Sequence, residues 1–438
     1  MKWVYLLGIV LLAPALAMLL RSNRRYLAPA CFVLGVSMLL IGPGLWTAVY
    51  GWPTWPAPVK GLEVSFVDAV AVALLASTKR VPIPFSFKLS LGIICLALVI
   101  STAASQNRVA AAFYIWELLR TVLLFVAIAR ACATDTRAAI ALVAGLALAM
   151  VFEPIWMLTQ HVDRPGGSLG HSNTFGIAAD FVMFPALALL FGGRRPALPA
   201  AAVAAGLVCA ILGGSRASLG LFTIGVVLTT VFSIFYKRSS RKYALAGVLA
   251  VLFVAAVPVL IWAPSHRSQQ DLASSDQQRA AMKEAARMIV ADHPLGIGAN
   301  QYVVVANVGG YSARAGVDWN WATRNAPVHD TYYLVTAEMS FIGLIGILAM
   351  FGSVLALGFR TLRRPIQDES GELVPGLLAA MIIVSIHISY EFAFMDFMLH
   401  YLFAMCAGML VAIAARTKEA ARAPARAALS PRALAPAT

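Results

Sequence analysis

Solid blocks of apolar residues recur along nearly the whole chain, separated by short polar loops. Each block is roughly 17–25 residues long, the length that a helix needs to cross a bilayer. Strands of a transmembrane barrel would instead alternate apolar and polar residues. The pattern predicts an all-α polytopic integral membrane protein with about 12 or 13 transmembrane helices. The candidate spans are 3–20, 27–48, 63–78, 86–104, 110–130, 137–160, 173–192, 197–213, 217–236, 243–263, 330–358, 375–393 and 397–415.

Composition agrees with this prediction. Of the 438 residues, 60% are hydrophobic and only 12% are charged, and the mean hydropathy is +0.80. A soluble protein would carry about a quarter charged residues. The net charge of +14 would suit a nucleic-acid partner, but the basic residues lie in short loops between apolar blocks, which is the signature of membrane topology. We therefore expect no nucleic-acid partner. The five cysteines lie in or beside apolar segments, which indicates neither a disulfide framework nor a zinc site.

Loop charges alternate along the chain and predict which side of the membrane each loop faces. The basic loops are expected to be cytoplasmic. They carry Arg21, Arg24, Arg25, Lys79, Arg80, Lys88, Arg130, Arg137, Arg194, Arg195, Lys237, Arg238, Arg241, Lys242, Arg360, Arg363 and Arg364. The loops between them face outward and hold most of the distinctive polar side chains. They are 49–62, 105–109, 161–172, 213–216 and the long segment 264–329.

Four regions follow from this topology. Residues 1–263 form N-terminal transmembrane helices, 264–329 a large outward loop, 330–415 the C-terminal transmembrane helices, and 416–438 a disordered cytoplasmic tail rich in Ala, Pro and Arg. The N-terminus resembles a secretory signal, but we interpret it as a first span because many spans follow it.

The long outward loop contains a predicted amphipathic helix that ends at His293-Pro294. Ser274 or Ser275 is the expected N-cap, and His293 is expected to be a capping or packing residue. The apolar residues at helical spacing are Ala281, Ala285, Met288 and Ile289. One polar stripe carries Arg279, Lys283 and Arg287. Such a helix is suited to lie on the membrane surface or to roof a cavity.

Arg216 follows Gly213-Gly214-Ser215 on the outward side. Glycines let a backbone approach a ligand closely, and a guanidinium fork matches the geometry of phosphate. An interfacial arginine that reaches toward headgroups is the simpler alternative. Basic residues usually lie on the cytoplasmic side, so an arginine at an outer edge is unusual. We therefore favour the interpretation that Arg216 binds a phosphate. Arg279 taken alone is equally well explained as part of a solvated helix face.

Other polar residues have structural and functional interpretations. Arg164, His171 and Asn173 lie in a glycine-rich loop, where a turn capped by Asn173 accounts for most of the pattern and substrate contact is the alternative. Glu117 and Arg120 are three apart within a span and are expected to pair on one helix face. Four carboxylates near expected span ends either line a cavity or lie at the interface. They are Glu153, Asp180, Glu391 and Asp396.

His329 lies directly before an apolar span. Asp330 is expected to cap the helix that starts at Thr331. This leaves the imidazole of His329 at the outer membrane edge, where it either meets a ligand or has no role beyond the interface. Spacing alone does not decide between the two.

Four segments, in order, resemble the bacterial O-antigen ligase and O-antigen polymerase superfamily, most of all the ligases. They are RPGGSLGHSN from Arg164, GGSRAS from Gly213, QQRAAMKEAARMIVADHPLGIGANQY from Gln277 and HDTYYLVTAEMSFIGLIG from His329. The resemblance covers roughly residues 150–350. Asp330 stands where the family usually has Asn, Ser or Gln, and Ser340 stands near a position where glycine is common.

The resemblance implies a GT-C-like membrane glycosyltransferase in the bacterial inner membrane, with its active site facing the periplasm. Such enzymes move a glycan from an undecaprenyl diphosphate carrier to an acceptor hydroxyl, which for the ligases belongs to lipid A-core. They use no nucleotide sugar, metal or other cofactor. The resemblance implies that His329 is catalytic, that Arg216 and Arg279 bind the diphosphate, and that Arg164, His171 and Asn173 lie in the substrate-binding loop.

General chemistry is compatible with this reading. Arginines could hold the diphosphate as the anomeric bond breaks, and a histidine base typically contributes about 10²–10⁴-fold. Direct attack by the acceptor would invert the anomeric centre. A polymerase or a protein O-oligosaccharyltransferase would use the same donor. A transporter is the alternative from another class, and would predict inverted repeats and a path lined by Glu117, Arg120 and Asp180.

Overall fold

The computed structural model of the chain describes residues 2–40, 46–193, 195–265, 269–366, 368–393 and 396–429. These residues are mostly helical. The long helices are α1 (Lys2–Ser22), α2 (Leu27–Leu40), α3 (Phe66–Ser77), α4 (Phe85–Ala104), α5 (Arg108–Thr134), α6 (Thr136–Thr159), α7 (Ser172–Gly192), α8 (Ala197–Leu212), α9 (Arg216–Tyr236), α10 (Ser240–Ser265), α11 (Gln269–Asp292), α15 (Thr331–Leu362), α16 (Leu373–His387) and α17 (Phe397–Leu429). Three short helices follow α11: α12 (Tyr302–Val308), α13 (Tyr311–Arg314) and α14 (Trp321–Arg324).

Within these ranges, nine helices are long and apolar enough to cross a membrane. They are α1, α4, α5, α6, α7, α9, α15, α16 with the turn before it, and α17. Helices α3 and α8 are apolar but shorter. The prediction of an all-α polytopic membrane protein is thus confirmed in its coarse form. The expected number of 12 or 13 spans stays a prediction.

The expected spans 27–48 and 63–78 are wrong in part, because a β-hairpin lies between them. Strands β1 (Trp46–Gly51) and β2 (Gly61–Ser65) pair antiparallel, with an irregularity in register between Ala48 and Tyr50. Aromatic and β-branched residues favour β1, and three prolines between the strands stop a helix from continuing. The close approach of the strands requires glycine, since a Cβ at Gly61 would lie 2.5 Å from the Tyr50 carbonyl oxygen.

Two other expected boundaries differ from the structure. Helix α16 ends at His387 instead of continuing to residue 393, so residues 388–393 form a loop before α17. Helix α17 continues to Leu429, beyond Arg416 where we expected the tail to lose order. The strong helix formers of the segment 418–423 favour this continuation as far as Pro424.

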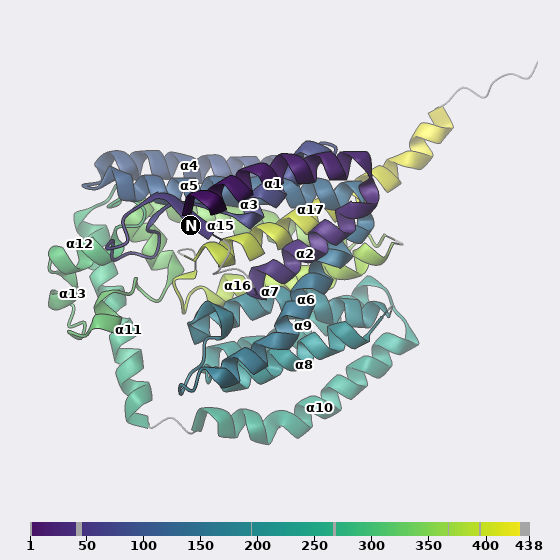
Figure 1. Ribbon diagram of the computed structural model, residues 1–438. Coiled ribbons are helices and arrows are strands. Elements are labelled where there is room, and N and C mark those ends of the chain that lie inside the picture. The colour runs from purple at the N-terminus through teal and green to yellow at the C-terminus, as the bar shows by residue number, and fades with distance from the viewer. Residues whose placement is uncertain are drawn as a thin grey trace, which may run out of the picture.

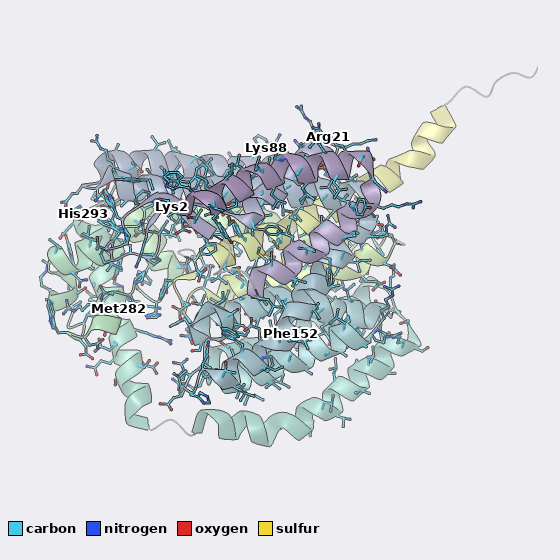
Figure 2. All side chains as sticks on the ribbon, in the orientation of Figure 1. Lys2, Arg21, Lys88, Phe152, Met282 and His293 are labelled. Carbon is cyan, nitrogen blue, oxygen red and sulfur yellow. The ribbon has the colours of Figure 1, made fainter. Side chains whose placement is uncertain are left out.

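The long helices lie side by side, and α11, α12 and α13 gather at one end of the bundle, on the left in Figure 1. Figure 2 shows Met282 and His293 at this same end. Helix α10 runs along the lower edge of Figure 1 and contacts α9 and α7. Helices α7, α16 and α17 are the most deeply buried of the nine, and α16 packs between α7 and α9.

Helix α11 begins at Gln269, five or six residues before the expected caps Ser274 and Ser275. Serine lowers helix propensity only modestly, so these residues do not start a new helix. Of the predicted apolar face, Ala285 and Ile289 are buried, and Ala281 and Met288 are half-buried against the core. Met282 and Ala286 are buried beside them. The helix ends before His293, whose Nε2 lies 3.2 Å from the Tyr311 hydroxyl. His293 is therefore a packing residue, as expected.

Helix α15 is broken at Met339 and Ser340, and the break anchors the segment after α11. Ser340 has φ 63° and ψ −177°, a conformation that favours glycine. The Glu338 carbonyl accepts a hydrogen bond from the Gly298 N–H at 3.0 Å. The Glu338 carboxylate accepts three more from the backbone N–H groups of residues 300–302, each at 2.9 Å. One buried glutamate thus holds residues 298–302 on the helix that His329 precedes.

Candidate active site

His329 lies immediately before α15, where its imidazole meets a carboxylate. Asp330 caps the helix as predicted, with Oδ1 accepting hydrogen bonds from the N–H groups of Tyr332 and Tyr333. The His329 Nδ1 lies 2.7 Å from Glu391 Oε1. The Glu391 side chain is 1% exposed and that of His329 is 19% exposed. A buried carboxylate therefore orients a histidine whose ring can still be reached.

The loop that carries Glu391 is bound to the first turn of α15. The Thr331 hydroxyl donates to the Glu391 carbonyl oxygen at 2.6 Å and accepts from the Ala393 N–H at 3.0 Å. The Thr331 N–H donates to the Ile388 carbonyl oxygen at 2.9 Å. These bonds explain why α16 has to end at His387. A helix that continued to residue 393 would not bring Glu391 to His329.

Asn173 belongs to the same group and is not the helix cap. The cap of α7 is His171, whose Nδ1 accepts from the Thr174 N–H at 3.4 Å. Asn173 lies in the first turn and its Nδ2 donates to Glu391 Oε2 at 2.9 Å. Arg164 donates from Nη2 to Asn173 Oδ1 at 3.0 Å. The expectation that Asn173 caps the helix was wrong because a neutral imidazole can accept the same N–H.

The two histidines of the site lie close together. The rings of His171 and His329 are 6.4 Å apart between centroids and inclined by 27°. Phe392 packs against both, with centroid distances of 6.2 Å to His171 and 5.1 Å to His329. The phenyl ring restricts both imidazoles, so the site holds its side chains by packing as well as by hydrogen bonds.

The pKa values of Glu391 and His171 are both lowered, with opposite consequences for their charge. Burial opposes ionisation of Glu391, but the hydrogen bond and charge of His329, the charge of His171 and the bond from Asn173 outweigh it and lower the pKa of Glu391 to about 2. Burial lowers the pKa of His171, Glu391 opposes this, and the charges of His329, Arg164 and Arg279 lower it further. At neutral pH, Glu391 is ionised and His171 is neutral.

The two other predicted arginines approach this group from α9 and α11. Arg216 is the first residue of α9, and its side chain is 50% exposed. Its Nη2 lies 3.4 Å from Oδ2 of Asp276 on α11. Arg279 follows one turn later on α11, near enough for its charge to act on His171. Helix α11 therefore contacts Arg216 through Asp276, and the charge of its Arg279 acts on His171.

Glycines shape the turn that precedes Arg216. The Gly213 carbonyl oxygen accepts from Arg164 Nε at 3.2 Å. Gly214 has φ 59°, which glycine adopts without strain. Ser215 then caps α9 by accepting from the Ser218 N–H at 3.3 Å. The predicted motif thus links Arg164 and Arg216 through one short turn.

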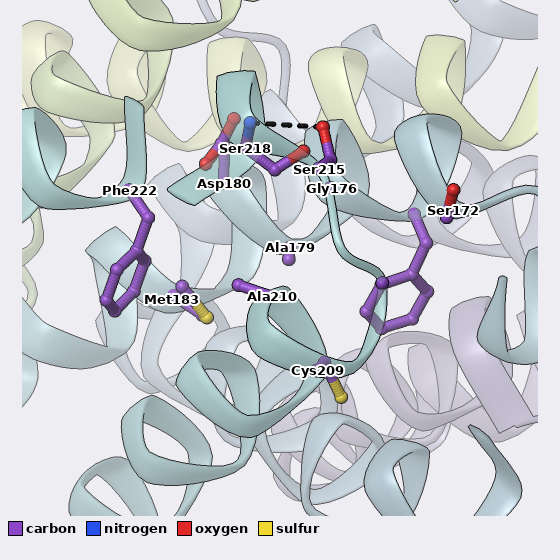
Figure 3. Close-up of a pocket in the computed structure, with 12 residues that line it drawn as sticks. Ser172, Gly176, Ala179, Asp180, Met183, Cys209, Ala210, Ser215, Ser218 and Phe222 are labelled. Carbon is purple, nitrogen blue, oxygen red and sulfur yellow. Dashed lines mark hydrogen bonds between the residues drawn. The ribbon is translucent and has the colours of Figure 1, made fainter. Parts of the chain in front are cut away.

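A buried polar group lies among α7, α9 and α16. His387 Nδ1 is 2.8 Å from Asp180 Oδ2, and its Nε2 is 3.5 Å from the Ser218 hydroxyl. Figure 3 shows Asp180, Ser215 and Ser218 on one side of a pocket with Phe222 and Met183 beside them. Since Ser218 is two residues from Arg216 and His387 is four from Glu391, this group fixes the helices that carry the site.

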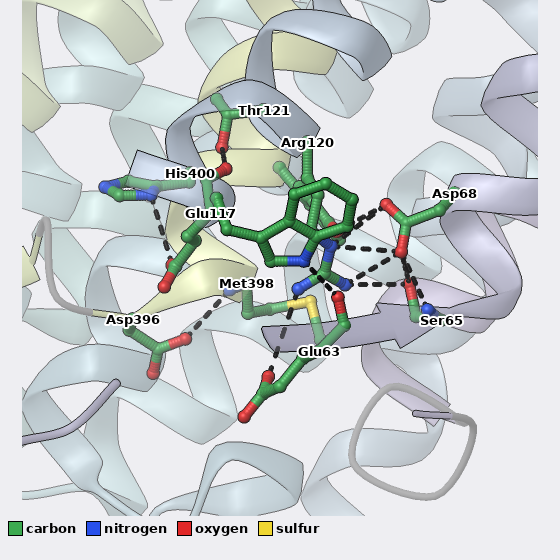
Figure 4. Close-up of polar contacts among 11 residues, drawn as sticks. Glu63, Ser65, Asp68, Glu117, Arg120, Thr121, Asp396, Met398 and His400 are labelled. Carbon is green, nitrogen blue, oxygen red and sulfur yellow. Dashed lines mark hydrogen bonds and ion pairs between the residues drawn. The ribbon is translucent and has the colours of Figure 1, made fainter. Parts of the chain in front are cut away.

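The expected pair between Glu117 and Arg120 is not formed. Arg120 instead donates to Asp68 through Nε at 3.0 and 3.1 Å and through Nη2 at 2.9 Å (Figure 4). Glu117 meets His400 at 3.3 Å. Asp68 offers both carboxylate oxygens to one guanidinium, which is a stronger arrangement than a pair three residues apart on one helix.

Glu391 was not predicted as the partner of His329, because the expected span 375–393 included it. The available signal was a charged residue between two apolar stretches. His171, Asn173, Arg164 and His329 are brought into one group, and Arg216 and Arg279 approach it through α11.

Neither the models of known protein families nor the curated proteins include a match to this chain.

Proposed function

We propose that the protein is a membrane glycosyltransferase that moves a glycan from a lipid diphosphate carrier to an acceptor hydroxyl, as the O-antigen ligases that it resembles do. The observation that carries the proposal is the His329–Glu391 pair, with a buried carboxylate on one ring nitrogen and cationic side chains nearby. The donor would be an undecaprenyl-diphosphate-linked glycan, and the acceptor a sugar hydroxyl of lipid A-core.

The proposed base is His329. Because Glu391 binds Nδ1, the Nδ1–H tautomer is favoured and the lone pair of Nε2 is left to accept a proton. In the proposed step, Nε2 takes the proton of the acceptor hydroxyl as its oxygen attacks the anomeric carbon. The carbon–oxygen bond to the diphosphate breaks, and the electron pair leaves with the lipid diphosphate. Ionised Glu391 stabilises the imidazolium that forms.

The proposed diphosphate ligands are Arg216 and Arg279. Both are arginines, whose planar forks match phosphate oxygens. Arg216 is half exposed and makes a long contact with a carboxylate that is itself 60% exposed, so the arginine can exchange Asp276 for a diphosphate. A developing negative charge on the leaving group is the charge that fixed cations stabilise best.

A single displacement with inversion is favoured by the bonding of Glu391. A retaining mechanism needs a second carboxylate as a nucleophile. Both oxygens of Glu391 already accept hydrogen bonds, from His329 and Asn173. The carboxylate nearest the histidine is thus engaged in orienting the ring.

The transporter alternative has weaker support. Asp180 pairs with His387, Glu117 with His400 and Arg120 with Asp68. The three residues of the expected path therefore belong to three different pairs, each between two helices.

The test is transfer in vitro from a defined undecaprenyl-diphosphate glycan to purified lipid A-core by the purified protein in detergent. Product is expected without added nucleotide sugar. A deletion strain separates the acceptors, because loss of a ligase leaves lipid-linked polymer beside bare core, whereas loss of a polymerase leaves core with a single repeat. The proposal fails if the purified protein forms no product either with lipid A-core or with a growing lipid-linked glycan as the acceptor.

A further inference from the structure

A largely apolar cavity of about 300 Å³ lies between α4, α5, α15 and α17, and none of the candidate active-site residues lines it. Helix α4 packs along α15 and α5 packs along α17, whereas α4 and α5 contact each other little. The rings of Phe87 and Phe125 stack across that gap at 5.7 Å. In a membrane protein, such a cavity is suited to an aliphatic chain.

The two ends of the cavity differ chemically. At one end lie His400 and Tyr114, with ring centroids 6.1 Å apart, and His400 is paired with Glu117. At the other end lies Lys88, which lines the cavity and is exposed. No ion pair joins Lys88 to a carboxylate among the residues that the structure describes.

Further cations lie around the Lys88 end. Lys79 and Arg80 are exposed and shortly precede Ile83, which also lines the cavity. Helix α15, which contributes Phe351, ends at Leu362, and three exposed arginines lie in its last turn and just after it: Arg360, Arg363 and Arg364. Basic loops are predicted to face the cytoplasm, where the leaflet carries anionic lipids and basic pockets between helices bind their headgroups.

We propose that this cavity is a binding site for an anionic phospholipid, with one acyl chain between the four helices and the phosphate at Lys88. Along α5 the lining extends from Tyr114 to Val126, about 18 Å at the helical rise. The hydrocarbon of one leaflet is about 15 Å thick, so the cavity matches one chain. The diphosphate carrier is not the proposed occupant, because its charged group belongs with Arg216 at the opposite end of the bundle.

The test uses the full-length protein in detergent, titrated with phosphatidylglycerol or phosphatidylethanolamine of identical chains and followed by native mass spectrometry and thermal melting. Phosphatidylglycerol is expected to remain bound at lower concentration and to raise the melting temperature more. Lys88→Gln should weaken phosphatidylglycerol binding roughly fivefold, since one cation near the surface contributes about that factor. It should weaken phosphatidylethanolamine less, because the ammonium of that headgroup offsets the phosphate charge. The matched control Arg238→Gln removes an exposed cation from the α9–α10 loop and should change neither.

A second variant tests the cavity itself. Ala404→Phe places a ring in the lining and should reduce binding of both lipids. Its melting temperature without lipid shows whether it folds, and if it does not, the Lys88 result alone decides. The proposal is overturned if Lys88→Gln keeps the full preference for phosphatidylglycerol, or if a folded Ala404→Phe variant binds both lipids as the parent does. Either result is independent of transferase activity.

Discussion

The Nζ of Lys283 lies 2.8 Å from Oδ2 of Asp330, so α11 is bound to the residue that follows the candidate base. Two turns earlier on α11, Asp276 contacts Arg216 at the start of α9. Asp330 is 6% exposed on its side chain and also caps α15. Helix α11 is thereby joined both to the start of α9 and to the residue beside the imidazole.

Glu391→Gln should lower the rate of transfer roughly tenfold or more while the protein still folds. Glutamine keeps the size of the side chain but not the charge that stabilises an imidazolium. His329→Ala should lower the rate by about 10²–10⁴-fold. Initial rates of the purified variants, beside the exposed control Glu284→Gln, measure both effects. Parental rates in a folded His329→Ala variant would remove the base assignment.

Arg216→Lys should reduce transfer roughly tenfold or more although the charge is kept, because an ammonium lacks the guanidinium fork. Asp276→Asn should act in the opposite direction on donor affinity, since it releases Arg216 from its carboxylate. The KM for the lipid donor, compared with kcat, measures both effects. The control is Arg314→Lys, whose guanidinium packs on Tyr311. An active Arg216→Lys variant would mean that only the positive field matters.

Glu338→Ala should loosen the segment that follows α11. Three backbone N–H groups of residues 300–302 lose their acceptor, and each buried unsatisfied group costs about 1–3 kcal/mol. Hydrogen exchange and limited proteolysis of residues 296–325 measure the loss, with Glu369→Ala as a comparison at the other end of the bundle. Unchanged protection of this segment would contradict the anchoring role.

Ser340→Gly should stabilise the protein by about 1 kcal/mol. The φ of 63° with extended ψ is a region that glycine adopts readily and serine does not. Part of the gain is offset because the Ser340 hydroxyl accepts from the Ile342 N–H at 3.2 Å, and because glycine adds freedom to the unfolded chain. Thermal melting measures the change, and Ser353→Gly within the regular part of α15 should be destabilising instead.

Glu63→Gln should stabilise the protein at pH 8 and not at pH 4. Burial and then the charge of Glu117 raise the pKa of Glu63 to about 7, against the attraction of Arg120. Between pH 4.5 and 7 the folded state binds more protons than the unfolded one, so stability falls as pH rises through this window. Glutamine removes that loss, at most about 3 kcal/mol. Equal melting differences at both pH values would contradict the shift.

The helices were predictable because an apolar block of bilayer length satisfies its backbone hydrogen bonds within lipid by forming a helix. The break at His387 was not, because residues 388–393 are apolar enough to extend a span and only their bonds to Thr331 show otherwise. The hairpin was missed for a similar reason, since a strand after a helix reads as a longer apolar block. His329, Arg164 and Asn173 could be selected by residue type and loop position, whereas the role of Glu391 depends on a contact 62 residues away in sequence.

The break at Ser340 has a mechanical consequence. On one side of it, the short segment from Thr331 to Glu338 is bound to the loop 388–393 and to Asn300. On the other side, the remaining turns of α15 form a separate apolar helical segment. Lipid bilayers of different thickness change the tilt of such helical segments. The break at Ser340 would act as a hinge between the two parts of α15 and accommodate that tilt. The distance between the His329 imidazole and the Glu391 carboxylate should therefore stay constant when the surrounding membrane becomes thicker or thinner.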